Sequence, residues 1–197
     1  MQLAAVRPTL IDHLWPAGSR PALRWVGLVL VGSLLLTASA KTQVPMWPVP
    51  MTMQSFVVLV IGMTYGARLS AAAVGLYLIE GMIGLPVFAG TPEKGIGIAY
   101  MAGPTGGYLI GFLIVAVAMG WLAERGWDRT WLRAVAAMTI GTVLLFVPGV
   151  AWLAVLVGWE TAIAAGLMPF ILGAALKLAL AATIMPVCWK ALEQRRR

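Results

Sequence analysis

Apolar residues occur along this chain in long runs, which are separated by short segments rich in proline, glycine or charge. A bilayer core about 30 Å thick needs roughly 20 apolar residues in each helix that crosses it. The runs therefore predict an all-α integral membrane protein. The six predicted membrane spans are residues 25–40, 52–65, 70–83, 106–122, 132–157 and 165–189.

Two connections between these spans are unusual. Residues 41–50 contain three prolines within six residues, and because each proline removes a backbone donor, no helix is expected there. Residues 85–103 form a long connection for so compact a protein, and long ordered loops are often lids or binding loops. Glycine, proline and tyrosine punctuate residues 77–112, which predicts backbone that turns inward and shapes a cavity. Within the fifth span, Pro148-Gly149 predicts a kink or a break.

The composition supports the same fold class. Hydrophobic residues make up 61% of the 197 positions and charged residues 11%, whereas soluble domains have about 45–50% and about 25%. A water-soluble core of this size could not bury the excess. We therefore predict one membrane domain over residues 1–197. It comprises a cytoplasmic arm (1–23), a six-helix bundle (24–190) and a basic cytoplasmic tail (191–197).

The basic residues are distributed unevenly between the two predicted sides of the membrane. Six spans place both termini on one side, and eleven Lys and Arg residues fall there, against only Lys41 and Lys94 on the other. Cytoplasmic segments carry such an excess, so both termini are predicted to be cytoplasmic. Topology thus accounts for the net charge of +7, and no nucleic-acid partner is needed.

Lys177 is an ionisable residue deep inside the last predicted span. It lies about 12 residues from the start, or roughly 18 Å at 1.5 Å per residue. A charge near the centre of a membrane helix costs roughly 2.5–3.5 kcal/mol on insertion scales. Such a lysine either contacts an anionic ligand or pairs with a carboxylate for structural reasons. Together with a cavity-forming loop, it suggests a site for a small anionic solute.

Glu80 is the only acid well inside a predicted span. It shares a helix face with Tyr77 and Gly84, at spacings of three and four residues. Its carboxylate could accept N–H bonds from a ligand, or it could neutralise Lys177. The two roles are compatible.

Other polar and aromatic residues allow two interpretations each. Gln54 opens the second span, where its amide could contact a ligand or could only cap the helix. In the sequence GPTGGY at 103–108, Thr105 can cap the fourth span, and the glycines allow close approach of either a helix or a ligand. Most tryptophans are placed as interfacial belt residues, but Trp47 lies in the proline segment and could line a site.

The sequence lacks the residues that several kinds of chemistry require. The sequence contains no Walker A motif for ATP, and its single histidine and single cysteine provide no metal cluster. No Ser-His pair lies in the predicted membrane segments. We therefore expect a protein that is not an enzyme and that has no cofactor or metal site.

Several separated motifs, in order, resemble one family. They are VPMTMQ at 49–54, GMIGLPVFAG at 81–90, GPTGGYLIGF at 103–112, and Gly173 four residues before Lys177. The chain resembles the BioY family, the biotin-specific substrate-capture (S) components of energy-coupling-factor transporters. The resemblance covers roughly residues 33–190.

The resemblance implies six helices, cytoplasmic termini and a high-affinity biotin pocket near the outer face of a bacterial plasma (inner) membrane. It also implies a membrane coupling subunit and two ATPase subunits as partners, although some members act without dedicated ones. Family members often have an acid directly after the glycine of the last-helix motif, whereas this chain has Ala174. The small-xxx-small pair of helix 1 has only approximate counterparts, Gly27-xxx-Val31 and Ser33-xxx-Thr37.

The chemistry of biotin fits the candidate residues. Its ureido ring needs acceptors for two N–H groups and donors for a carbonyl, its carboxylate favours a cation, and its thioether ring favours apolar walls. In the absence of the usual acid, Glu80 is predicted to accept from the ureido ring. The predicted binding residues are Lys177, Glu80, Gln54, Tyr77, Phe88, Tyr108 and Trp47.

Two other functions stay open. One is a self-sufficient secondary transporter for a small organic anion. The other is a membrane enzyme acting on lipid, with Glu80 and Lys177 as acid and base.

Overall fold

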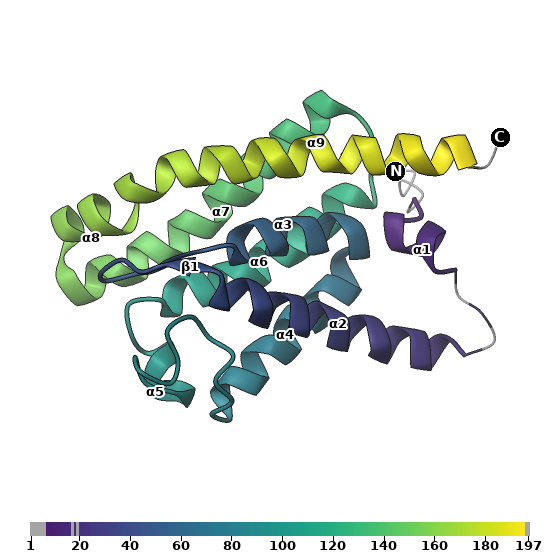
Figure 1. Ribbon diagram of the computed structural model, residues 1–197. Helices are drawn as coiled ribbons and strands as arrows, with labels where there is room; N and C mark the ends of the chain where they lie inside the picture. Colours follow the sequence, from purple (N-terminus) through teal and green to yellow (C-terminus); the bar gives the residue numbers. More distant parts are fainter. Residues whose placement is uncertain (1–6, 17, 19, 196–197) are drawn as a thin grey trace, which may run out of the picture.

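The computed structural model describes residues 7–16, 18 and 20–195, and these are mostly helical (Figure 1). Helix α1 and the end of the last helix lie at the same end of the molecule, called the terminal end below. The elements are α1 (Leu10–Leu14), α2 (Pro21–Lys41), β1 (Gln43–Val44), β2 (Met51–Thr52), α3 (Gln54–Tyr65), α4 (Ala67–Met82), α5 (Gly97–Met101), α6 (Gly106–Ala123), α7 (Trp131–Val157), α8 (Trp159–Gly166), the 3₁₀ helix η1 (Met168–Phe170) and α9 (Ile171–Arg195).

Four described helical segments are long and apolar enough to cross a membrane. They are α2, α6, α7 and the segment Trp159–Gln194. The predicted second and third spans are present as α3 and α4, but these have only 12 and 16 residues. At 1.5 Å per residue, α3 is about 18 Å long, well short of a bilayer core. The number of membrane crossings therefore stays a prediction.

Two predicted details of the spans need correction. Helix α7 continues through Pro148, so this proline does not divide the fifth span. The predicted sixth span is instead interrupted, because η1 separates α8 from α9 around Pro169. Pro169 has no N–H to continue the helix of α8.

Residues 43–52 form a short hairpin in place of a helix, as the three prolines led us to expect. Gln43 pairs with Thr52 and Val44 with Met51 in antiparallel register. In Figure 1 the hairpin extends from the end of α2 towards α8. It also approaches α9, since a Cβ atom added to Gly173 would lie 2.9 Å from the sulfur of Met51.

Glycines allow α6 and α7 to pack closely. A Cβ atom on Gly107 would lie 2.4 Å from the carbonyl oxygen of Pro148, and one on Gly149 would lie 2.3 Å from the ring of Tyr108. Both distances are too short for any other residue. In the sequence GPTGGY, Gly107 therefore serves helix-to-helix contact, and Thr105 makes no side-chain capping bond.

The long connection between α4 and α6 is ordered around Phe88. The side chain of Phe88 is fully buried, with its ring centroid 5.3 Å from that of Tyr77 and 5.0 Å from that of Tyr100. A Cβ atom on Gly81 would lie 2.0 Å from the Phe88 ring, so glycine provides the space. The Tyr100 hydroxyl donates to the carbonyl of Ala89 at 2.6 Å. Aromatic packing thus holds this connection against α4.

Lys41 fixes the same connection from the end of α2. Its ammonium group donates to the carbonyl oxygens of Phe88 and Thr91, both at 3.1 Å, and to the hydroxyl of Thr91 at 3.2 Å. All three donors of the ammonium group are therefore used within the protein.

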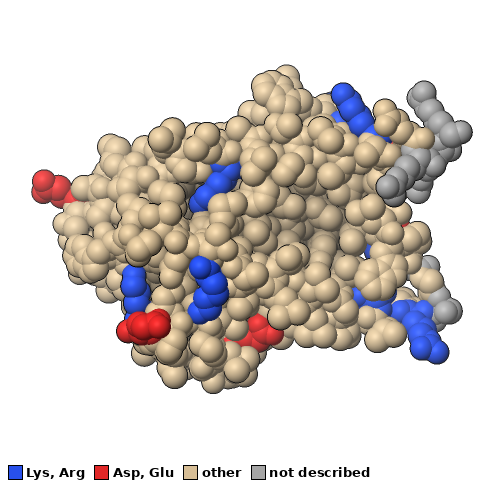
Figure 2. Space-filling view, viewed as in Figure 1, with Lys and Arg blue, Asp and Glu red and all other residues tan. Residues whose placement is uncertain are grey.

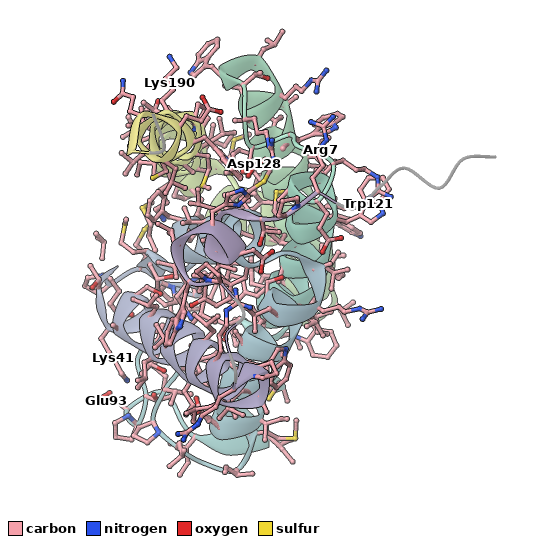
Figure 3. All side chains as sticks on the ribbon, turned by 90° about the vertical axis from the view of Figure 1, so that its right-hand side faces the viewer. Arg7, Lys41, Glu93, Trp121, Asp128 and Lys190 are labelled. Carbon is pink, nitrogen blue, oxygen red and sulfur yellow. The ribbon has the colours of Figure 1, made fainter. Side chains whose placement is uncertain are left out.

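At the terminal end, a buried cluster joins α1, α9 and the turn between α6 and α7. Asp128 is fully buried and accepts a 2.6 Å bond from the indole N–H of Trp189 (Figure 3). The guanidinium of Arg129 lies 4.3 Å from the Trp189 ring centroid, and His13 packs edge-on at 5.0 Å. Burial raises the pKa of Asp128, although the bond from Trp189 opposes the shift.

The charge distribution matches a protein with an apolar belt. On the face in Figure 2 most of the surface is uncharged, and the charged side chains lie at the two ends and in the left half of the view. Arg7, Arg24 and Arg68 line one hollow at the terminal end, together with Glu124. The structure thus gathers basic residues from distant parts of the chain at one end.

We predict that Gly149→Ala lowers the unfolding temperature in detergent. The added methyl group meets the Tyr108 ring, which cannot move freely because its hydroxyl bonds to Gly166 at 2.7 Å. Overpacking of this kind costs about 1–3 kcal/mol. Gly75→Ala in α4 is the control, because no atom lies within 4 Å of its added Cβ. An unfolding temperature for Gly149→Ala as high as that of the control would contradict the close packing.

We predict that Lys41→Met increases amide hydrogen exchange in residues 88–94. Hydrogen bonds to a charged group contribute about 1.5–3 kcal/mol, so local opening should become at least about tenfold more frequent. Mass spectrometry of the detergent-solubilised protein measures this. Lys94→Met is the control, since Lys94 is exposed and makes no side-chain hydrogen bond among the described residues. Equal exchange in Lys41→Met and the unmodified protein would contradict the prediction.

Candidate functional site

A cleft of about 560 Å³, including its open mouth, lies at the end of the bundle away from the termini. The hairpin, the connection between α4 and α6, and parts of α3, α6, α7, η1 and α9 line it. Its walls are mostly apolar and aromatic. The residues with polar side-chain groups that line it are Thr52, Gln54, Ser55, Tyr100, Thr105, Tyr108 and Lys177.

Lys177 enters the cleft from α9 and bonds to the segment where the hairpin joins α3. Its ammonium group donates to the carbonyl oxygen of Thr52 and to the hydroxyl of Ser55, the latter at 3.3 Å. In the described part of the chain, the one ion pair joins Arg24 and Asp12, so no carboxylate neutralises Lys177. Since an ammonium group has three donors, one stays available to a ligand.

Gln54 is buried at the start of α3, with 4% of its surface exposed, and it lines the cleft. Its amide nitrogen donates to the Tyr77 hydroxyl at 2.6 Å, and its amide oxygen accepts from the Thr52 hydroxyl at 3.3 Å. The side chain makes no capping bond at the start of α3. Of the two interpretations that the sequence left open, the structure favours a position in the site.

Aromatic rings form one wall of the cleft. Tyr108 and Phe146 meet edge-to-face with centroids 6.2 Å apart, and Phe146 and Phe170 follow at 6.4 Å. The Tyr108 hydroxyl is occupied by the carbonyl of Gly166, so this residue offers the cleft mainly its ring. Such a wall suits an apolar ring on a ligand.

Four predicted binding residues do not line the cleft. Tyr77 and Phe88 are fully buried behind it. The carboxylate of Glu80 accepts a hydrogen bond from Ser33 of α2, so the predicted pair between Glu80 and Lys177 is not formed. Trp47 is 77% exposed on the hairpin.

Glu80 departs from the prediction because of helix packing. The face of α4 that carries it packs towards α2, whereas Lys177 lies on α9. The sequence spacing correctly grouped Glu80 near Tyr77 on one helix but could not identify the neighbouring helix. We therefore withdraw Glu80 as the partner of Lys177.

Sequence reasoning missed several residues of the cleft. Ser55 follows Gln54 directly, and its hydroxyl contacts Lys177. Phe146 lies in α7 and Phe170 in η1, within predicted spans that are apolar throughout, so nothing in the sequence distinguishes them from other span residues. Pro169 beside Phe170 was the one signal of a break at this position.

The chain is similar to proteins of one known family. It matches the BioY family over residues 14–194. A probable biotin transporter BioY of Pyrococcus horikoshii is 35% identical over 159 residues, which cover 81% of this chain and 92% of the relative. A biotin transporter BioY of Thermotoga maritima is 36% identical over 151 residues, covering 76% and 86%.

A solved structure has the same fold. It is the S component for biotin of an ECF-type ABC transporter, and it superposes with a TM-score of 0.75 at 22% identity. The match covers 88% of this chain and 94% of the solved chain. Since the family match extends over nearly the whole chain, this protein belongs to the BioY family.

Proposed function

We propose that this protein captures biotin in the membrane and serves its uptake, as the S component of an energy-coupling-factor transporter. The observation that carries the proposal is the cleft, in which the ammonium group of Lys177 has no carboxylate partner among the described residues and lies beside apolar walls. Membership of the BioY family and the relatives' names as biotin transporters support it.

The groups in the cleft correspond to the parts of biotin. Gln54 and Lys177 supply an acceptor and a cation, and Thr52 and Ser55 add hydroxyl groups close by. The rings of Tyr108, Phe146 and Phe170 provide a surface for the thioether ring. In this proposal Lys177, Gln54 and Tyr108 contact the ligand directly, and no cofactor takes part.

The proposed topology has six membrane crossings and cytoplasmic termini, in the plasma (inner) membrane of a bacterium. The basic residues at the terminal end support this orientation. The cleft then opens towards the outer face. Non-helical backbone at membrane depth is tolerated where it lines a cavity, which describes both the hairpin and the connection between α4 and α6.

We further propose a membrane coupling subunit and two ATPase subunits as partners. The fold of the solved S component supports this assembly. Helix α2 offers an exposed apolar surface that includes Leu30, Val31, Leu34 and Leu35. A coupling subunit or lipid could cover it within the membrane.

We predict that biotin binds the purified protein and stabilises it. A ligand at 100 times its dissociation constant stabilises the folded state by about 2.7 kcal/mol, so the unfolding temperature should rise measurably. Calorimetric titration with biotin, and with other vitamins as controls, measures the affinity and the selectivity. A folded protein that shows neither heat of binding nor a thermal shift with saturating biotin would refute the proposal.

We predict that Lys177→Met weakens biotin binding at least about tenfold while the protein still inserts. A charge-assisted hydrogen bond contributes about 1.5–3 kcal/mol, and removing an intramembrane charge does not hinder insertion. Lys190→Met is the matched control on the same helix, because Lys190 is exposed and lies outside the cleft. Equal affinities of the two variants would show that Lys177 is structural.

A further inference from the structure

We propose that Tyr77, which does not line the cleft, holds the Gln54 side chain in one orientation, with its amide oxygen presented to an N–H group of the ligand. This inference rests on the proposed function, because the N–H group is assigned to the ureido ring of biotin. Tyr77 is then a positioning residue, and Gln54 Oε1 is a specific acceptor in the site.

The evidence follows the proton of Tyr77. Its hydroxyl has one proton, and the carbonyl oxygen of Val87, 3.3 Å away, can only accept it. The Tyr77 oxygen is then an acceptor for Gln54 Nε2 at 2.6 Å. The NH₂ group of Gln54 therefore points away from the cleft, towards Tyr77.

Thr52 lies on the other side of the amide and accommodates the same orientation. The Thr52 hydroxyl accepts the backbone N–H of Gln54 at 3.3 Å. Its oxygen also lies 3.3 Å from Gln54 Oε1, so its own proton can be donated to that atom. The Thr52 hydroxyl, which can donate or accept, is thus compatible with the orientation that the Tyr77–Val87 hydrogen bond selects.

The opposite orientation has an identifiable cost. If the amide turned over, Oε1 would face the Tyr77 oxygen, and the hydroxyl proton would have to turn towards it. The carbonyl of Val87 would then lose this donor in a buried region, since Tyr77 is fully buried and Val87 is only 9% exposed. Leaving a buried polar group unpaired is unfavourable, so the Tyr77 hydroxyl selects one orientation.

The selected orientation determines what the site can bind. A carbonyl oxygen has two lone pairs, and Thr52 occupies one of them with a long hydrogen bond, leaving the other for the cleft. An amide oxygen accepts an N–H group without adding charge. The neighbouring cation of Lys177 is therefore not neutralised, and the site can bind a ligand that combines N–H donors with an anionic group.

The test is calorimetric titration with biotin of four proteins: the unmodified chain, Tyr77→Phe, Gln54→Glu and the double variant. Tyr77→Phe keeps the ring that packs on Phe88 but frees the amide, and its affinity should fall about tenfold, which corresponds to the loss of about one hydrogen bond. A carboxylate presents an acceptor in either orientation. In the Gln54→Glu background, Tyr77→Phe should therefore lower the affinity for biotin less than about threefold.

Tyr100→Phe is the control for this comparison. Tyr100 is also buried, packs on Phe88 and bonds to a backbone carbonyl of the same connection, but it makes no hydrogen bond to Gln54. Its substitution should change the affinity by the same factor in both backgrounds. The inference would be overturned if Tyr77→Phe left the affinity for biotin unchanged, or lowered it by the same factor in both backgrounds. Either result would leave the proposed function standing.

A structure with bound biotin gives an independent test if a variant does not fold. Gln54 Oε1 within hydrogen-bond distance of a ureido nitrogen would support the inference, and a Gln54 amide against the ureido oxygen would overturn it. Failure of the unmodified protein to bind biotin at all would instead overturn the proposed function and this inference with it.

Discussion

This structure depends on one constraint. Backbone N–H and C=O groups that lie outside helices in a membrane protein must find hydrogen-bond partners within the protein. The hairpin and the connection between α4 and α6 expose carbonyl groups that helices would bond internally, and lipid offers no replacement. Two lysines meet this need: Lys177 donates to Thr52 at the base of the hairpin, and Lys41 donates to Phe88 and Thr91. Each lysine therefore fixes one of the irregular segments that line the cleft or support it.

Close helix packing places the cleft between these segments. Because glycines bring α6 against α7, the ring of Tyr108 lies beside the backbone of Gly149, and its hydroxyl reaches Gly166 of α8. The aromatic wall formed with Phe146 and Phe170 follows from this arrangement. A rigid wall on one side and lysine-held loops on the other define the space for a ligand.

Long apolar runs act locally, so the sequence predicted the long helices, but it did not predict α1, α5 or the interruption at η1. Lys177 and Gln54, which the sequence singled out for their polarity, both line the cleft. The sequence-based predictions failed for residues whose contacts depend on which helices pack against each other. Glu80 turned out to face Ser33 of α2, and Lys41 was counted only as a topological charge although it holds a loop. Phe88 was expected in the site because it lies in the segment GMIGLPVFAG, yet its ring packs in the space that the missing side chain of Gly81 leaves.

The absence of a carboxylate beside Lys177, among the described residues, gives the cleft an electrostatic preference for anions. A partly buried cation that bonds only to a carbonyl and a hydroxyl has lost part of its hydration without gaining an opposite charge. An anionic ligand group supplies that charge, so its binding relieves a cost that the folded protein already carries. A structural carboxylate would remove the cost in the absence of ligand, and with it much of the preference for anions. The bonds to Thr52 and Ser55 therefore hold the ammonium group in place while leaving its charge for the ligand.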